Sequence, residues 1–155
     1  MEISYVADTF ELAAQLIPGL LNHWRPYVPE DTWESRVEKL QSHMNRNELP
    51  MAWLAHEGSR ALGTAALRLY DLPGRKDLSP WLGGVYVAPE FRKRGVAGSL
   101  CQVVEARASE LGFQQLYLFT LDQHVFYSRL GWRTMESSWW NGHAIDIMTK
   151  VIDAG

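Results

Sequence analysis

The stretch Arg92-Lys93-Arg94-Gly95-Val96-Ala97-Gly98 decides the fold of this chain. It follows the apolar run Val85-Tyr86-Val87-Ala88-Pro89 and opens a helical pattern that continues to Leu111. The first turn of a helix presents unpaired N–H groups and a positive dipole end, and glycine lets an anion approach the backbone closely. The stretch therefore predicts a phosphate-binding turn between a strand and a helix. If this turn is considered without its neighbours, the alternative is that Arg92 to Arg94 are solvent-exposed cations at an ordinary helix start.

The spacing of this stretch excludes two common nucleotide motifs. It lacks the Gly-x-Gly-x-x-Gly pattern of dinucleotide-binding folds, and no Gly-Lys-Ser/Thr follows as in a P-loop. Hydrophobic periodicity elsewhere predicts one α+β domain over residues 1–155. Strands are expected at Ile3–Ala7, Met51–Glu57, Ala61–Tyr70, Trp81–Val87, Gln115–Thr120, Trp132–Trp140 and His143–Val151. Helices are expected from Phe10 to Leu21 with a kink at Pro18, from Trp33 to Met44, from the glycine turn to Leu111, and from Phe126 to Leu130.

Composition narrows the class of protein. The chain has 155 residues, a formal net charge of −3 and a single cysteine, Cys101, which excludes an internal disulfide and fits a reducing compartment. The negative charge argues against nucleic-acid binding, and no apolar stretch is long enough to span a membrane. We expect a cytoplasmic protein with no nucleic-acid or membrane partner and no metal.

The residues around the turn resemble those of the GNAT (GCN5-related N-acetyltransferase) superfamily. Val85 to Pro89 followed by Arg92-x-x-Gly95-x-Ala97 matches its first signature, and Phe126-Tyr127-x-x-Leu130-Gly131-Trp132 is similar to its second. The order of elements also agrees over essentially the whole chain. The resemblance implies a single GNAT domain with a mixed sheet of about seven strands and about four helices, in which the fourth and fifth strands splay apart.

The resemblance also implies acetyl-CoA as co-substrate and an amine as acceptor. The pantetheine arm would lie between the splayed strands, with a bulge at Gly83-Gly84 and backbone partners on the fourth strand. A strand N–H, at Val87 or its neighbour, would stabilise the oxyanion. The residues implied for the cofactor are Val85, Tyr86, Val87, Arg92, Lys93, Arg94, Gly95, Val96, Ala97, Gly98, Thr120 and Tyr127.

Tyr127 matches the family's tyrosine that donates a proton to the leaving thiolate, and a packed tyrosine with a satisfied hydroxyl is the alternative. Thr120 stands where many members have an asparagine, in a Thr-x-Asp-Gln-x-x-Phe-Tyr pattern that resembles one branch of the family. The fourth strand carries no carboxylate that could act as a base. The candidates from elsewhere are Glu30, Glu34, Asp122, His124, His143 and Asp146.

The acceptor site is predicted from aromatic residues in the segments that usually form it in the family. Tyr27, Trp33, Trp81 and Trp139 suggest an aromatic-walled cleft for an amine, and packing in the core or in a homodimer is the alternative for each. The leading function is transfer of an acetyl group to a primary amine of a small molecule or peptide by direct attack in a ternary complex. The alternative is a non-catalytic module that binds acyl-CoA or a metabolite with the same fold.

Overall fold

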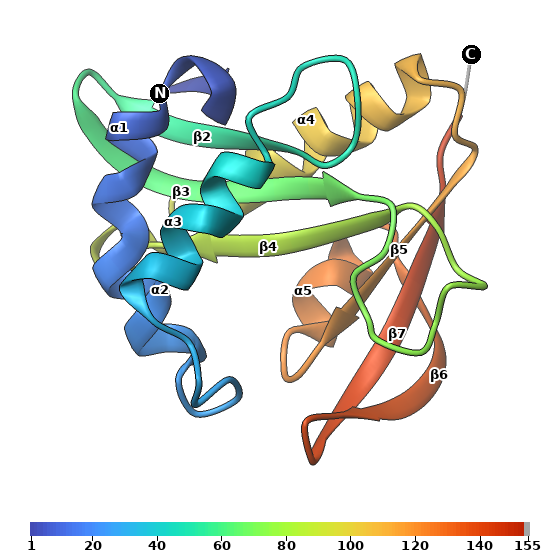
Figure 1. The fold of residues 1–155 in the computed structure, drawn as a ribbon. Helices are drawn as coiled ribbons and strands as arrows, with labels where there is room; N and C mark the ends of the chain where they lie inside the picture. The colour runs from blue at the N-terminus through green and yellow to red at the C-terminus, as the bar shows by residue number, and fades with distance from the viewer. Residues whose placement is uncertain (154–155) are drawn as a thin grey trace.

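The computed structural model describes residues 1–153 and shows a seven-stranded sheet with the strand order β1-β2-β3-β4-β5-β7-β6 (Figure 1). All neighbouring strands are antiparallel except β4 and β5, which are parallel. The sheet is therefore mixed, as predicted. The strands are β1 (Glu2–Tyr5), β2 (Met51–Glu57), β3 (Arg60–Arg68), β4 (Trp81–Val87), β5 (Gln115–Thr120), β6 (Arg133–Trp140) and β7 (His143–Val151).

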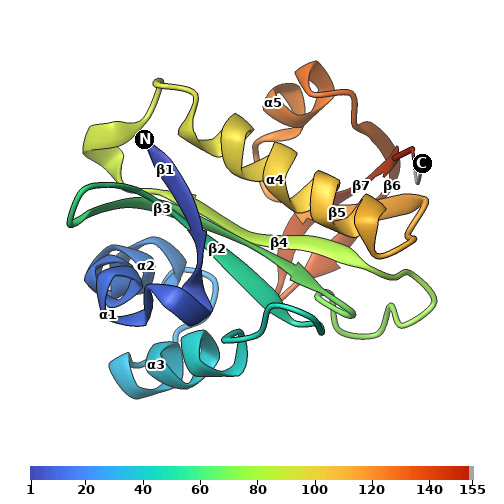
Figure 2. The same ribbon diagram turned by 90° about the horizontal axis from the view of Figure 1, so that it is seen from above.

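Helices cover both faces of the sheet. Figure 2 shows α1, α2 and α3 on one face and α4 and α5 on the other. Their bounds are α1 (Phe10–Ala13), α2 (Ile17–Trp24), α3 (Trp33–Ser42), α4 (Val96–Glu110) and α5 (His124–Arg129). Within residues 1–153, no helix combines the length and the apolar composition that a membrane span requires.

The first predicted helix is interrupted before Pro18. A short 3-10 helix (Ala14–Leu16) separates α1 from α2, and Pro18 then lies in the first turn of α2, where its missing N–H does no harm. The second predicted helix begins at a capping box in which Thr32 Oγ1 accepts from Ser35 N (3.1 Å) and Ser35 Oγ accepts from Thr32 N (2.9 Å). It ends at Ser42, so Met44 lies outside it.

The core lies between the sheet and its helices. A large cluster joins α4 to the centre of the sheet through fully buried side chains such as Leu67, Leu82, Leu100 and Met148. A second, smaller cluster lies towards the last hairpin, where Trp81 packs among Leu72, Leu78, Ile145 and Ile147. Both clusters contain side chains from β4 and from β7, so they pack the two halves of the sheet together across the β4–β5 junction.

That junction is open. β4 and β5 pair at a single position, Trp81 opposite Tyr117, and the two strands then run apart (Figure 1). The β3–β4 register also shifts between the pairs Thr64–Tyr86 and Ala66–Gly83, so β4 has one extra residue there. Gly84 within this bulge adopts φ +60°, a conformation that glycine accepts readily. The predicted splay and the predicted bulge are both confirmed.

The last hairpin turns at Asn141-Gly142, a dipeptide that is typical of tight hairpin turns. Asn141 and Gly142 have φ of +47° and +81°, as a tight two-residue turn between β6 and β7 requires. The Asn141 side chain donates to the Tyr27 carbonyl (2.9 Å) and thereby ties the hairpin to the segment that follows α2.

Candidate active site

A cavity of about 730 Å³ occupies the gap between β4 and β5. Its lining continues from the start of α4, past the bulge of β4 and the end of β5, to α2, α3 and the tip of β6. Its volume is in the range of pockets that hold drug-sized ligands. Segments distant in sequence thus form one continuous site.

The phosphate turn lies at one end of this cavity. Gly95 is the residue before α4, has φ +80° and provides no side-chain cap, so the first N–H groups of the helix have no capping acceptor. Lys93 also has a positive φ, +64°, which a non-glycine residue adopts only under local constraint. A Cβ added at Gly95 or Gly98 would meet no atom within 4 Å, so the turn faces open space. This arrangement of free N–H groups suits an anion.

The backbone of β4 presents hydrogen-bonding groups to the gap. Ala88 donates its N–H to the Leu62 carbonyl of β3 (2.9 Å). Because successive N–H groups point to opposite edges of a strand, the neighbouring Val87 N–H points towards β5, where β4 has no partner strand. The Val87 carbonyl on that edge accepts from Arg92 Nε (3.0 Å). Val87 N–H is therefore free to donate to a group in the cavity.

Of the twelve residues predicted for the cofactor, eleven line this cavity. The exception is Arg94, whose guanidinium lies over the Phe91 ring, 5.7 Å from the ring centre. Thr120 lines the cavity, but its hydroxyl already accepts from Gln123 N (2.9 Å). That bond closes the turn that leads into α5.

Tyr127 reaches the cavity from α5 and is almost completely buried. Burial, with a smaller contribution from Cys101, raises the pKa of Tyr127 well above its ordinary value. Its phenol is therefore protonated at neutral pH. Among the described residues, none forms a hydrogen bond with the Tyr127 hydroxyl, so the proton is free to be donated to a ligand.

The aromatic wall at the other end of the cavity consists of Trp24 and Trp140, whose rings are 6.0 Å apart and nearly perpendicular. Tyr27 stacks on the Trp140 ring from behind (6.1 Å) and does not line the cavity itself. Trp24 and Trp140 were not among the residues predicted for the acceptor. They occur in the segments expected to form the cleft, but strand and helix periodicity does not tell which tryptophan of a pair faces inward.

The other three predicted acceptor residues lie outside the cavity. Trp81 is 0% exposed and donates its Nε1–H to the Leu78 carbonyl (2.7 Å), because it faces the second core cluster rather than the gap. Trp33 is 46% exposed at the start of α3, and Trp139 is 70% exposed because alternation along β6 turns Trp140 inward instead. None of these three side chains lines the cavity.

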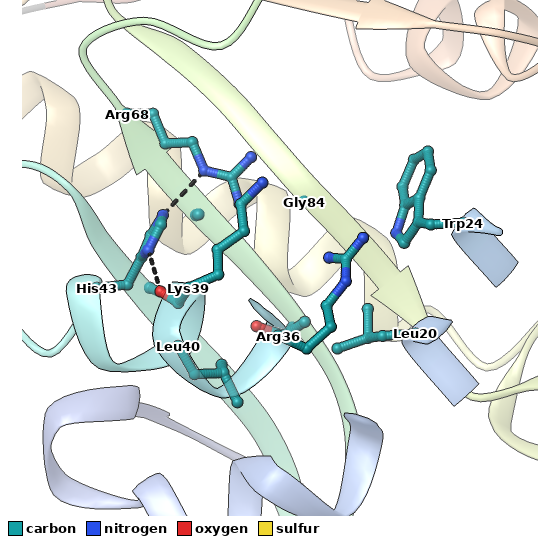
Figure 3. Close-up of a pocket in the computed structure, with 11 residues that line it drawn as sticks. Leu20, Trp24, Arg36, Lys39, Leu40, His43, Arg68 and Gly84 are labelled. Carbon is teal, nitrogen blue, oxygen red and sulfur yellow. Dashed lines mark hydrogen bonds between the residues drawn. The ribbon is translucent and has the colours of Figure 1, made fainter. Parts of the chain in front are cut away.

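Three cationic side chains that were not predicted from the sequence line the same end of the cavity as Trp24. Arg36 and Lys39 on α3 and Arg68 at the end of β3 surround a small pocket beside Gly84 that shares these residues with the main cavity (Figure 3). Their spacing of three along α3 places Arg36 and Lys39 on one helix face, which was readable from the sequence. Their proximity to Arg68 depends on how α3 packs over the sheet.

Of the proposed bases, only Asp122 lines the cavity. The structure adds His23 on α2, whose imidazole lies 5.5 Å from the Tyr86 ring. Burial, reinforced by Arg92, lowers the pKa of His23, so the ring is neutral at neutral pH and able to accept a proton. The nearby Asp122 carboxylate acts to raise the pKa of His23, and it would stabilise the imidazolium once the ring is protonated.

The architecture is similar to that of solved acetyltransferases. An aminoglycoside 6'-N-acetyltransferase complexed with coenzyme A superposes with a TM-score of 0.73 at 18% identity, covering 97% of each chain. The ribosomal-protein-alanine N-acetyltransferase of Brucella melitensis superposes with 0.71 at 15% identity, covering 98% of this chain and all of the other. The aminoglycoside 6'-N-acetyltransferase of Enterococcus faecium superposes with 0.71 at 18% identity, covering 97% of each chain.

At these identities the superpositions show the fold. No curated protein sequence shows significant similarity to the chain. The model of the Acetyltransferase (GNAT) family matches residues 17–132, which include α2, the bulged β4, the phosphate turn and Tyr127. The chain therefore belongs to the GNAT family of acetyltransferases.

Proposed function

We propose that this protein transfers the acetyl group of acetyl-CoA to a primary amine, with both substrates bound in the same cavity. The observation that carries the proposal is the continuity of that cavity, from the uncapped start of α4 through the β4–β5 gap to the Trp24–Trp140 wall. A pyrophosphate and an acceptor bound at opposite ends would meet between β4 and Tyr127.

Each part of the lining has a role in this reaction. The N–H groups of the turn at Gly95 bind the pyrophosphate, and the free edge of β4 at Val85 and Val87 pairs with the pantetheine amides. The acceptor nitrogen attacks the thioester carbonyl, so that a C–N bond forms and the C–S bond breaks. Val87 N–H donates to the oxyanion that develops at this carbonyl.

Two protons move in opposite directions. Tyr127 donates its phenolic proton to the sulfur as the C–S bond breaks, and water in the cavity returns a proton to the phenolate. Burial makes Tyr127 a weak acid, but it also makes a nearby thiolate a strong base. The Cys101 thiol illustrates this effect, because burial raises its pKa to about 12. His23 accepts the proton that the amine loses, directly or through a water.

The experiment has a binding part and a turnover part. Acetyl-CoA and CoA should each raise the melting temperature, because a ligand that binds the native state stabilises it. Thiol release with a panel of amines should then identify an acceptor, and Tyr127→Phe should lower kcat by about 100-fold or more. Tyr117→Phe is the matched control, since Tyr117 lies on β5 outside the cavity and should keep full activity.

The outcomes separate the alternatives. Stabilisation by CoA without thiol release from any amine would favour the non-catalytic binding module. The absence of stabilisation would overturn acetyl-CoA as substrate. If Tyr127→Phe retained the wild-type kcat, the assignment of Tyr127 as the acid would be withdrawn.

A further inference from the structure

Three cations converge on the acceptor side of the cavity. Figure 3 shows Arg36, Lys39 and Arg68 extending their head groups towards the β4 ribbon at Gly84, with Trp24 beyond them. Arg36 and Lys39 come from α3 and Arg68 from β3, so the tertiary fold alone brings them together. The chain as a whole carries a formal charge of −3, so this local concentration of positive charge is opposite in sign to the net charge of the protein.

Carboxylates compensate only part of this charge. Arg36 Nε lies 2.5 Å from Asp31 Oδ2, and Arg68 Nη1 lies 2.8 Å from Asp71 Oδ1. Both guanidinium groups are largely buried, with side chains 13% and 14% exposed. Among residues 1–153, no carboxylate lies within 4 Å of the Lys39 ammonium. Three cations face two carboxylates, and one positive charge is without a partner.

The protonation states expected for these groups leave this positive charge in place at neutral pH. Arg68, helped by burial, lowers the pKa of Lys39 to about 8, so the ammonium is still mostly protonated at pH 7. Burial and the charge of Arg68 lower the pKa of His43 to about 4, so this histidine is neutral and adds nothing. Hydrogen bonds from Ser35 and Arg36 outweigh the effect of burial and lower the pKa of Asp31, which is therefore ionised.

The Arg68 guanidinium lies against the bulge of β4. A Cβ built on Gly84 would be 2.8 Å from Arg68 Nη2, so the guanidinium packs directly on the glycine backbone. Arg68 is held there because its Nε donates to His43 Nε2 (2.9 Å) and its Nη1 donates to Asp71. Among the described residues Nη2 has no hydrogen-bond partner, and with the Arg36 and Lys39 head groups it faces the cavity.

We propose that the acceptor is an amine that also carries an anionic group, a carboxylate or a phosphate, which binds between Arg36, Lys39 and Arg68. This inference rests on the proposed function and defines its substrate class. A carboxylate or phosphate would receive charge-assisted hydrogen bonds from the guanidinium and ammonium groups and would neutralise the unpaired charge. Polycationic acceptors, such as aminoglycosides, would be repelled here.

Binding to the protein saturated with CoA tests the proposal without requiring turnover. The indoles of Trp24 and Trp140 line the cavity, so their fluorescence should report an acceptor. γ-Aminobutyrate should bind at least about tenfold more tightly than its uncharged amide γ-aminobutyramide, and phosphoethanolamine more tightly than ethanolamine, as one well-placed charge interaction predicts. The pair with the larger ratio identifies the anion as carboxylate or phosphate.

A variant removes the unpaired charge without breaking an ion pair. Lys39→Met should abolish the preference for the acidic member of each pair and leave CoA affinity within about twofold of wild type. Lys76→Met is the matched control, because Lys76 is exposed in the loop before β4 and does not line the cavity. The control should keep the wild-type preference.

Equal binding of acidic and neutral amines, or tighter binding of spermidine or kanamycin, would overturn the anionic acceptor even if acetyl transfer occurs. An unchanged preference in Lys39→Met would overturn the role of the three cations. Failure of CoA itself to bind would instead overturn the proposed function, because the phosphate turn lies at the other end of the cavity.

Discussion

Acidification should weaken the fold through His43, the buried histidine that holds Arg68. His43 Nδ1 lies 2.7 Å from the Lys39 carbonyl and therefore donates, whereas Nε2 accepts from Arg68 Nε (2.9 Å). Only the neutral ring with its proton on Nδ1 satisfies both bonds. A proton added to Nε2 would remove the acceptor of Arg68 and place two positive charges in contact.

The magnitude follows from the pKa difference between the folded and unfolded chains. The pKa of His43 has its ordinary value of 6.5 in the unfolded chain, and burial in the folded chain lowers it to about 4. Below pH 6.5 the unfolded state binds the proton first, so stability is lost as the pH falls from about 6.5 to 4. Between pH 7 and pH 4.5 the free energy of unfolding should decrease by about 2 kcal/mol through this group.

The variant His43→Phe isolates this effect. At pH 7 it removes the acceptor of a buried charged donor and should destabilise the fold by about 2 kcal/mol. The variant has no titrating group at position 43, so the difference in the free energy of unfolding between wild type and variant should approach zero at pH 4.5. Urea denaturation of both proteins at pH 7, 6, 5 and 4.5, followed by circular dichroism, measures the gap directly.

The other carboxylates and histidines titrate equally in wild type and in His43→Phe. Their contributions therefore cancel in the difference between the two free energies of unfolding. A gap that stayed constant within about 0.5 kcal/mol across this range would refute the reasoning. It would mean that folding does not change the pKa of His43, and that Arg68 is held against Gly84 by Asp71 alone.

Two further predictions concern backbone positions around the cavity. Gly84→Ala should destabilise the fold by about 1–2 kcal/mol more than Gly74→Ala. Both glycines have a positive φ, but only a Cβ at position 84 would collide with Arg68. Equal midpoints of urea unfolding for the two variants would contradict this prediction. Ala97→Glu in the first turn of α4 should leave the melting temperature of the free protein unchanged or slightly higher, since a carboxylate favours a helix start, yet should weaken CoA binding at least about tenfold by calorimetry. Full CoA affinity in that variant would show that the pyrophosphate lies elsewhere.

Local sequence signals determined most of the fold because the structures they specify are local. The capping box at Thr32, the Asn141-Gly142 turn and the glycines of the phosphate turn act over three or four residues, and the structure has each of them. The bulge at Gly83-Gly84 was readable for the same reason. The strand after it, the turn and the Phe126-Tyr127 pair also sufficed to indicate the family.

Only the tertiary structure decided which side chains line the end of the cavity proposed for the acceptor. Periodicity shows that Trp139 and Trp140 face opposite sides of β6, but the packing of Trp140 against Trp24 decides which side is the cavity. Trp81 was predicted for the acceptor and lies in the core, because β4 turns that side chain away from the gap. Arg36 and Arg68 are 32 positions apart, and no pattern in the sequence relates them. Their meeting beside Gly84 depends on α3 packing across β3, a long-range contact that the chain specifies only through its complete core.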